Sequence, residues 1–393
     1  MLTDTAPDSA SLRTAGPATL GAAIQAQRTS TLQALQGLQA AHWLGPTLPI
    51  VNPPLWELGH IGWFHERWSL RERSDAEPRA SLLATADQLY DSARVAHASR
   101  WRLPLEPLPV VHQYLQDVLE QALSRLAGLT DDDPALYFHR LPLFHEMMHR
   151  EAFCYSWQTL GYPRPVDLPA AQVLPAQQWL DIAGQVVTVG SDQDGGFVFD
   201  NEKWATAQTV APFRISNRVV SCGEFAQFVV DGGYRHEAFW APHYWHELQA
   251  LGRAGPRHWR RSGDTFEVRS FGRWEPLVPE LPMVHVSAWE AQAWCCWAGR
   301  ALPSEAQWLA ASTHEAFAWG AAWEWTASPF AALPGFAADP YREYSEPWFG
   351  THRLLKGASV VTPAALRDRR FRNFYEPFRD DVFNGFRVLI PGR

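Results

Sequence analysis

Hydrophobic residues recur at helical spacing in four long segments near the start of the chain. The segments cover residues 20–38, 53–73, 109–129 and 141–163, and the second has prolines at its start. The third stops at Gly128, before a run of polar turn residues. No strand-like alternation separates the four segments. The pattern therefore predicts an antiparallel four-helix bundle.

The pattern changes beyond Tyr162, where a proline-rich stretch predicts a linker over residues 166–180. Residues 181–393 contain short apolar runs, many glycines and frequent turn signals, interrupted by helical patterns at 287–300 and 303–312. This mixture of short apolar runs, turn signals and helical patterns predicts an α+β domain with much irregular structure. At the other end, residues 1–16 are small and polar, and we expect them to be disordered before a bundle over residues 17–165.

Composition limits which classes of binding partner we expect and indicates the cellular compartment. The net charge is −8 and no long basic run occurs, which argues against nucleic-acid binding. No uncharged apolar run reaches the roughly 18 residues of a membrane-spanning helix, and the first 20 residues lack the basic and apolar pattern of a signal peptide, so we expect none. The cysteines lack metal-binding or disulfide spacing, and the adjacent pair Cys295–Cys296 is interpreted as core. We expect a cytoplasmic protein with small-molecule partners and no membrane contact.

Two histidines in the fourth helical segment suggest a metal site. His145 and His149 are four residues apart, so they lie on one face of a helix and can bind one ion together. A third ligand should come from another helix, and His60, in an apolar and aromatic stretch, is the best candidate. Glu151 lies about 200° round the helix from His149. We therefore expect Glu151 to orient a ligand, or to make a polar contact between helices, rather than to bind the ion.

The ligand types alone do not determine which metal ion binds, or whether a metal ion binds at all. Three neutral imidazoles suit zinc, iron, nickel or copper, for hydrolysis or for chemistry with O₂. Histidines four apart also occur as ordinary polar residues of amphipathic helices.

The second domain resembles a known family. In order, the segments "LPMVHVSAWEAQAWCCWAGRALPSEAQWLAAS", "AWEWTASPF", "PGFAADPYREYS", "LLKGASVV" and "RNFYEPFRDDVFNGFRVLI" resemble the formylglycine-generating-enzyme fold, a C-type-lectin-like domain. The match spans roughly residues 180–390. The formylglycine enzymes use a cysteine pair near their C-terminus, and this chain has no cysteine after Cys296, so their activity is not implied.

The first domain resembles a DinB-type bundle, and the combination resembles the ergothioneine-type sulfoxide synthases over nearly the whole chain. The resemblance implies an Fe(II) ion bound by His60, His145 and His149, with O₂ as co-substrate. It further implies that sulfur is joined to the imidazole C2 of hercynine, which is Nα-trimethylhistidine.

Two departures from that family concern the thiol substrate. Family members that use γ-glutamylcysteine carry a signature close to Arg-Asn-Trp-Asp, whose aspartate holds the amine of the thiol substrate. Here the signature reads Arg372-Asn373-Phe374-Tyr375, with a phenol in place of the acid. The arginine-rich stretch that grips the peptide carboxylates corresponds to residues 89–107, which have a different pattern.

These departures resemble the selenoneine synthases, the selenium branch of the group, which join hercynine to a selenosugar. A glutamine of the relatives is Met148 here, so Met148 is expected to line the pocket. A neutral sugar needs aromatic and hydroxyl partners more than a salt bridge. The alternatives are a sulfur-using ergothioneine-type enzyme, a DinB-type metal-dependent thiol transferase, and a non-catalytic binding protein.

The resemblance also implies roles for residues of the signature. Phe374 and Tyr375 would hold the trimethylammonium group by cation–π attraction. Asn373 would bind the hercynine carboxylate, and Arg379 would bind the second substrate or brace the loop. The family tyrosine that supplies a proton is Leu333 here, so Tyr375 is the candidate acid. The alternative for residues 373–375 is a packed core segment of the lectin-like fold.

Overall fold

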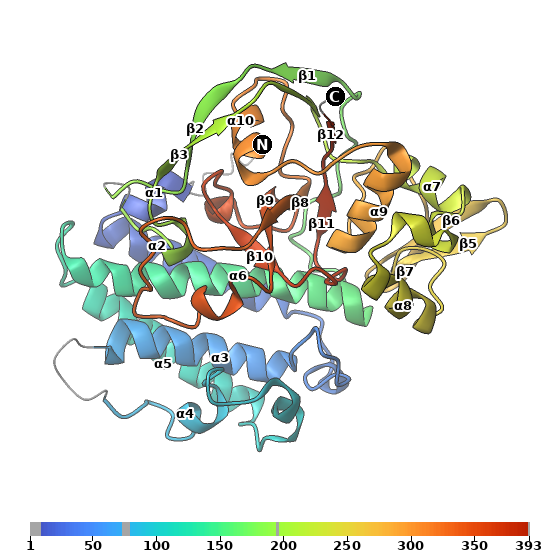
Figure 1. Cartoon of the computed structure of the whole chain (residues 1–393). Helices are drawn as coiled ribbons and strands as arrows, with labels where there is room; N and C mark the ends of the chain where they lie inside the picture. Colours follow the sequence, from blue (N-terminus) through green and yellow to red (C-terminus); the bar gives the residue numbers. More distant parts are fainter. Residues whose placement is uncertain (1–8, 73–78, 194–195, 392–393) are drawn as a thin grey trace. The chain divides into compact units, whose positions relative to one another are not determined.

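The computed structural model describes residues 9–72, 79–193 and 196–391 (Figure 1). The chain divides into two compact units. The first contains Met1–Asp167 and the short segment Thr362–Leu366, and the second contains Leu168–Val361 and Arg367–Arg393. The first unit is helical, and every strand of the described chain belongs to the second.

The first unit is built on four long helices, which confirms the predicted helical domain. They are α2 (Pro17–Ala34), α3 (Pro54–Glu66), α5 (Leu108–Leu126) and α6 (Tyr137–Leu160). Helices α2 and α3 each pack against both α5 and α6, so the four enclose one core. Prolines in the first turns of α2, α3 and α5 fit there because those backbone N–H groups lack helical acceptors.

An internal proline helps to fix α6. Pro142 has no N–H to donate to the carbonyl of Phe138, four residues earlier. The hydroxyl of Ser69 donates to that carbonyl instead, at 3.0 Å. Ser69 lies in a single π-helical turn, Arg67–Arg71, that continues α3. This hydrogen bond therefore links the end of α3 to the first turns of α6, a few residues before His145.

The expectation of disorder over residues 1–16 is wrong where the structure describes them. Helix α1 spans Ser9–Thr14, with Leu12 and Arg13 buried and the Nε of Arg13 donating to the hydroxyl of Ser9. Helix α2 then begins at Pro17. A single buried leucine in a short polar stretch gives too little periodicity to predict this turn. Residues 1–8 lie outside the described residues.

Short elements complete the first unit. They are η1 (Ala40–His42), η2 (Arg67–Arg71), α4 (Ala86–Leu89), η3 (His97–Arg102), η4 (Pro134–Leu136) and η9 (Ala364–Leu366).

The second unit has a central mixed sheet in the order β10-β9-β8-β11. Its strands are β8 (Ala322–Pro329), β9 (Arg353–Ala358), β10 (Asn373–Tyr375) and β11 (Asn384–Phe386). Only β8 and β11 run parallel among these pairs. On β8, the buried Glu324 accepts hydrogen bonds from Arg387 and from the indole of Trp308. A buried charge with these partners ties the sheet to its neighbours.

Three smaller sheets accompany the central one. They are β1-β4-β12 (Trp179–Ile182, Phe213–Ser216, Leu389–Ile390), β2-β3 (Gln185–Val189, Thr206–Val210) and β5-β6-β7 (Trp259–Ser262, Thr265–Ser270, Arg273–Pro276). The helices are α7 (Cys222–Val230), α8 (Pro242–Ala250), α9 (Ala288–Ala298) and α10 (Glu305–Ala311), with short turns η5 (Asp200–Glu202), η6 (Gly233–Arg235), η7 (Glu237–Phe239) and η8 (Glu346–Trp348). Serines 221, 287 and 304 form capping boxes at α7, α9 and α10. The α+β prediction for this domain is confirmed.

The cysteines are all free thiols. Cys295 is buried as predicted, but Cys296 is exposed, so the interpretation of both as core residues is wrong for Cys296. Adjacent residues of a helix point about 100° apart, and α9 buries only one of the two. No helix among the described residues is both long and apolar enough to cross a membrane.

Candidate metal centre

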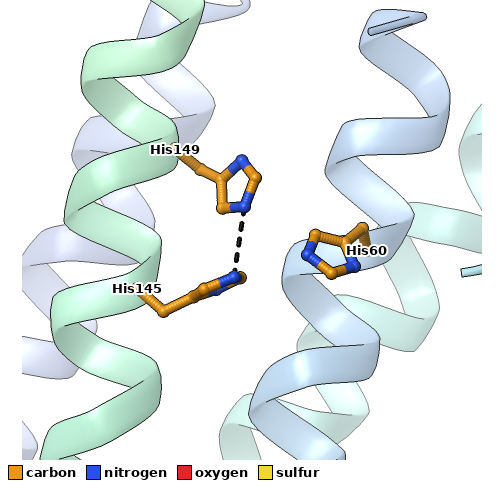
Figure 2. A group of neighbouring side chains, drawn as sticks. All are labelled: His60, His145 and His149. Carbon is orange, nitrogen blue, oxygen red and sulfur yellow. Dashed lines mark hydrogen bonds between the residues drawn. The ribbon is translucent and has the colours of Figure 1, made fainter. Parts of the chain in front are cut away.

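Helices α3 and α6 bring three histidines together. His145 and His149 lie one turn apart on α6 and face His60 on α3 (Figure 2). One ring nitrogen from each residue lies within 4.8 Å of those of the other two. The Nε2 atoms of His145 and His149 are 3.2 Å apart, and the His60 ring centroid is 5.1 Å from each of the other rings. This is the grouping that the sequence predicted.

Hydrogen bonds set the tautomers of two of the rings. The Nδ1 of His60 lies 2.8 Å from the carbonyl oxygen of Tyr90, which can only accept, so this nitrogen carries the proton. The Nδ1 of His149 lies 2.7 Å from a carboxylate oxygen of Glu57 and donates in the same way. With the proton on Nδ1, the Nε2 of a neutral ring holds the lone pair that binds a metal ion.

Glu57 is a residue that sequence reasoning missed. It lies on α3, one turn before His60, and is 1% exposed. The available signal was its spacing of three residues from His60 in a helix that is otherwise mostly apolar. A carboxylate in such a place needs a partner, and His149 supplies one.

Burial favours the neutral form of two of the candidate ligands, His60 and His145. Desolvation lowers the pKa of His60 well below its usual value, and the neighbouring His149 lowers it further. Desolvation likewise lowers the pKa of His145, whose ring stacks on Phe64 at a centroid distance of 3.5 Å. A neutral imidazole is the form that binds a metal. The donor set and its charge state fit a divalent first-row transition metal ion.

A second polar network lies behind the cluster on α6. Arg28 on α2 donates two hydrogen bonds to Glu146, at 2.8 and 3.0 Å. Burial acts to raise the pKa of Glu146, but the charges and hydrogen bonds of Arg28 and His65 together outweigh it, and the pKa falls to about 2. His65 lies 3.9 Å from the same carboxylate and is not part of the three-histidine group, as its spacing from His60 predicts. This network links α6 to α2, whereas Glu57 links α6 to α3.

A guanidinium group lies on the aromatic wall beside His60. The Trp56 ring stacks on His60 at 5.0 Å, and Arg100 lies over Trp56 at 3.7 Å. Burial lowers the pKa of Arg100 to about 10, so it stays charged at neutral pH. Arg100 belongs to the stretch of residues 89–107 and was not singled out from the sequence.

The other residues predicted for this unit are Glu151 and Met148. Glu151 is buried and accepts a hydrogen bond from the hydroxyl of Thr362 at 3.0 Å. The carboxylate bonded to a histidine of the cluster is Glu57. Met148 is half-buried on α6, next in sequence to His149. Its place in a pocket stays a prediction.

The signature residues of the second unit lie together on β10 and the loop after it. Phe374 stacks on Phe330 at 4.0 Å, and its neighbours include Tyr344 and His352. The side-chain oxygen of Asn373 accepts the backbone N–H of Phe374 at 2.9 Å.

The two remaining signature residues contact each other. The guanidinium of Arg379 lies 5.1 Å from the Tyr375 ring centre. Arg379 also donates two hydrogen bonds, at 2.6 and 2.7 Å, to the buried Asp381. Its charge is therefore paired within the protein. Leu333 is buried in an apolar cluster.

Comparisons with known proteins cover both units. Residues 23–153 match the model of the DinB superfamily, and residues 167–322 match that of the sulfatase-modifying factor enzyme 1-like domain. A formylglycine-generating enzyme of Streptomyces coelicolor is 29% identical over 174 residues, which cover 39% of this chain and 53% of that protein. Among solved structures, PvdO of Pseudomonas aeruginosa is 17% identical, and the alignment covers 56% of this chain and 98% of the PvdO chain. Its TM-score of 0.34 is too low to extend the comparison.

Longer matches span both units at once. The hercynine oxygenase of Mycolicibacterium smegmatis is 31% identical over 396 residues, which cover 86% of this chain and 91% of that protein. The hercynine oxygenase of Mycobacterium tuberculosis is also 31% identical, with the same two coverages. This chain belongs to the hercynine oxygenase family.

Proposed function

We propose that this protein is a non-haem Fe(II) enzyme that uses O₂ to join a selenosugar to the imidazole C2 of hercynine. The observation that carries the proposal is the histidine cluster in a chain whose full-length relatives are named hercynine oxygenase. Forming the carbon–selenium bond removes a hydrogen from each substrate. This is an oxidation, and O₂ would accept the electrons.

In this proposal the iron would be held by His60, His145 and His149. When bound, iron would supply the one-electron chemistry with O₂ that these side chains cannot perform. Three ligands leave positions open for substrates. The Nδ1 atoms of His60 and His149 are already engaged in hydrogen bonds, so the Nε2 atoms of these two rings need little reorganisation to bind the ion.

Two groups beside the cluster and one in the second unit would assist. The charge of Glu57, bonded to His149, would offset part of the positive charge of the ion. Arg100, held on Trp56, would attract the carboxylate of a substrate. Phe374 in its aromatic surroundings would accommodate the trimethylammonium group of hercynine.

The selenium donor is the finer part of the proposal, and Tyr375 supports it. A phenol stands where thiol-using relatives have an aspartate, and the nearby Arg379 is already paired with Asp381. Position 375 therefore offers no carboxylate for the ammonium group of a thiol peptide. A sugar donor has no ammonium group to satisfy.

The assay uses purified protein loaded anaerobically with Fe(II). We expect O₂ consumption only with hercynine and a donor present, and faster turnover of 1-seleno-N-acetylglucosamine than of γ-glutamylcysteine. Mass spectrometry would identify the product. Equal or faster use of γ-glutamylcysteine would favour the sulfur-using enzyme, and turnover without O₂ would favour a thiol transferase.

Two pairs of variants test the metal site and the choice of donor separately. His149→Ala should abolish turnover, whereas His112→Ala, at an exposed position of α5, should not. Tyr375→Asp should raise the relative kcat/KM for γ-glutamylcysteine about tenfold, because a charge-assisted hydrogen bond contributes about 1.5–3 kcal/mol. Tyr375→Phe, which adds no charge, should leave that ratio unchanged.

A further inference from the structure

The second unit contains a pocket whose wall is rich in arginine. Its volume is about 400 Å³, within the range typical of small-molecule sites. None of the described residues that line it is acidic. The charged and aromatic members of the wall are Arg235, Arg253, Arg257, Arg260, Arg261, Tyr234, Trp259 and Phe266.

Buried carboxylates outside the lining hold two of these arginines. Asp380 accepts a hydrogen bond from Arg253 and another from Arg257, each at 2.6 Å. Glu290 accepts a longer one from Arg253, at 3.4 Å. Asp380 is 1% exposed and Glu290 is fully buried. These carboxylates therefore fix the guanidinium groups without lining the pocket.

The arginines keep donors available. Arg257, Arg260 and Arg261 each donate to the protein through Nε, and their terminal nitrogens make no hydrogen bond within the described chain. The exposed side chain of Arg235 has neither a hydrogen bond nor an ion pair among the described residues. The two terminal nitrogens of a guanidinium group match the spacing of two phosphate oxygens. Several of these arginines could therefore bind one phosphate group.

Aromatic rings complete the wall. Trp259 on β5 and Phe266 on β6 are half-buried, with ring centroids 5.4 Å apart. Arg261 lies over the Phe266 ring at 5.8 Å. Partly exposed rings next to guanidinium groups provide a stacking surface for a planar group. The positive charge is local, because the chain as a whole carries a net charge of −8.

We propose that this pocket binds a nucleoside diphosphate. The arginines bind the diphosphate, and the rings of Trp259 and Phe266 contact the base. The site lies within the second unit and uses none of the residues assigned to the metal centre or to the signature strand. The proposal therefore does not depend on the proposed function.

Isothermal titration calorimetry of the full chain at low ionic strength tests the proposal with three probes. ADP should bind, inorganic pyrophosphate should bind more weakly, and adenosine should not bind. Added salt should weaken ADP binding, because the pocket is open to solvent. Absence of ADP binding, or adenosine binding as tightly as ADP, would overturn the proposal. So would tighter binding of a short single-stranded RNA, since the surface would then be a nucleic-acid site.

Variants locate the binding. Arg235→Ala combined with Arg261→Ala should weaken ADP binding at least about tenfold, because each loses charge-assisted hydrogen bonds. Neither residue has a carboxylate partner in the described chain, so the fold should be retained, as circular dichroism would check. The matched control is Arg214→Ala, at an exposed arginine on β4 paired with Asp181, which should leave binding unchanged. Equal weakening in the control would place ADP elsewhere and refute the pocket.

A last variant tests the base contact separately. Trp259→Leu should reduce ADP binding to the level of pyrophosphate and leave pyrophosphate binding unchanged. If ADP binding is unaffected, the rings do not contact the base and the nucleoside part of the proposal fails.

Discussion

Each unit buries a group of histidines, and the two groups differ in what surrounds them. In the first unit, His60, His145 and His149 converge and a carboxylate contacts one ring. In the second, His258 and His285 pack edge to face at 4.9 Å. Desolvation lowers the pKa in both groups, so burial of neutral imidazole does not distinguish them.

The number of converging rings and the charged group that contacts a ring nitrogen do distinguish them. The histidine pair has no third His, Cys or carboxylate ligand within reach among the described residues. A terminal nitrogen of Arg269 lies 3.1 Å from the Nδ1 of His258, and the carboxylates of Asp380 and Asp381 act on His285. A guanidinium group there repels a cation, whereas Glu57 beside His149 attracts one. Burial alone therefore does not mark a candidate metal site, which also needs convergent lone pairs.

Removing a ligand from the cluster is expected to have the largest effect. His60→Ala should lower Fe(II) affinity by more than about 100-fold, beyond the 10–100-fold typical of losing a partner of a ligand. His285→Asn in the histidine pair should leave the affinity unchanged. Anaerobic metal-competition titration measures both. Loss of iron in both variants would mean that the two groups do not differ as proposed.

Removing the negative charge of Glu57 is expected to have the next largest effect on Fe(II) affinity. Glu57→Gln keeps the size of the side chain but removes the negative charge, and Fe(II) affinity should fall about 10–100-fold. Glu151→Gln is the matched control, because Glu151 accepts a hydrogen bond from Thr362. It should change the affinity much less. A larger loss in the control than in Glu57→Gln would reassign the orienting role to Glu151.

The histidine pair should appear in the pH dependence of stability. Burial lowers the pKa of His285 to about 4, whereas the unfolded residue titrates near 6.5. Between these values only the unfolded state binds the proton, so the free energy of unfolding falls as the pH decreases. The expected loss from pH 7 to pH 5 is about 2 kcal/mol for this residue.

Urea denaturation of the metal-free protein at the two pH values measures this loss. His285→Asn should reduce it, and asparagine suits the positive φ of 62° at this position. An identical pH dependence in the wild-type protein and the variant would show that His285 is not held neutral by burial.

The sequence predicted the long helices and the convergence of the three histidines, because both follow from residue spacing. His145 and His149 share a face by periodicity, and His60 stands in a stretch too apolar for an unpartnered imidazole. Other features depend on contacts between distant segments. The carbonyl of Tyr90 that fixes His60 is a backbone group 30 residues away, with no signal in side-chain type.

Glu57 and Cys296 show a different limit of sequence reasoning. Helix α3 is buried on nearly all faces, so no polar face marked which of its side chains meets α6. The cysteine pair on α9 lies in an apolar stretch that suggests burial of both thiols, but tertiary packing covers only Cys295. In each case the outcome depends on which neighbouring element covers a given face, which spacing along one helix does not determine.

The central claim is that the histidine cluster of the bundle binds the catalytic iron. Iron K-edge X-ray absorption of the anaerobically loaded protein tests it most directly. The account predicts one iron per chain, with scattering from three imidazole rings at about 2.1 Å, close to the distance of other metal–histidine bonds. It also predicts that this scattering disappears in His149→Ala. A spectrum without imidazole ligands, or the same spectrum in wild-type protein and variant, would contradict it.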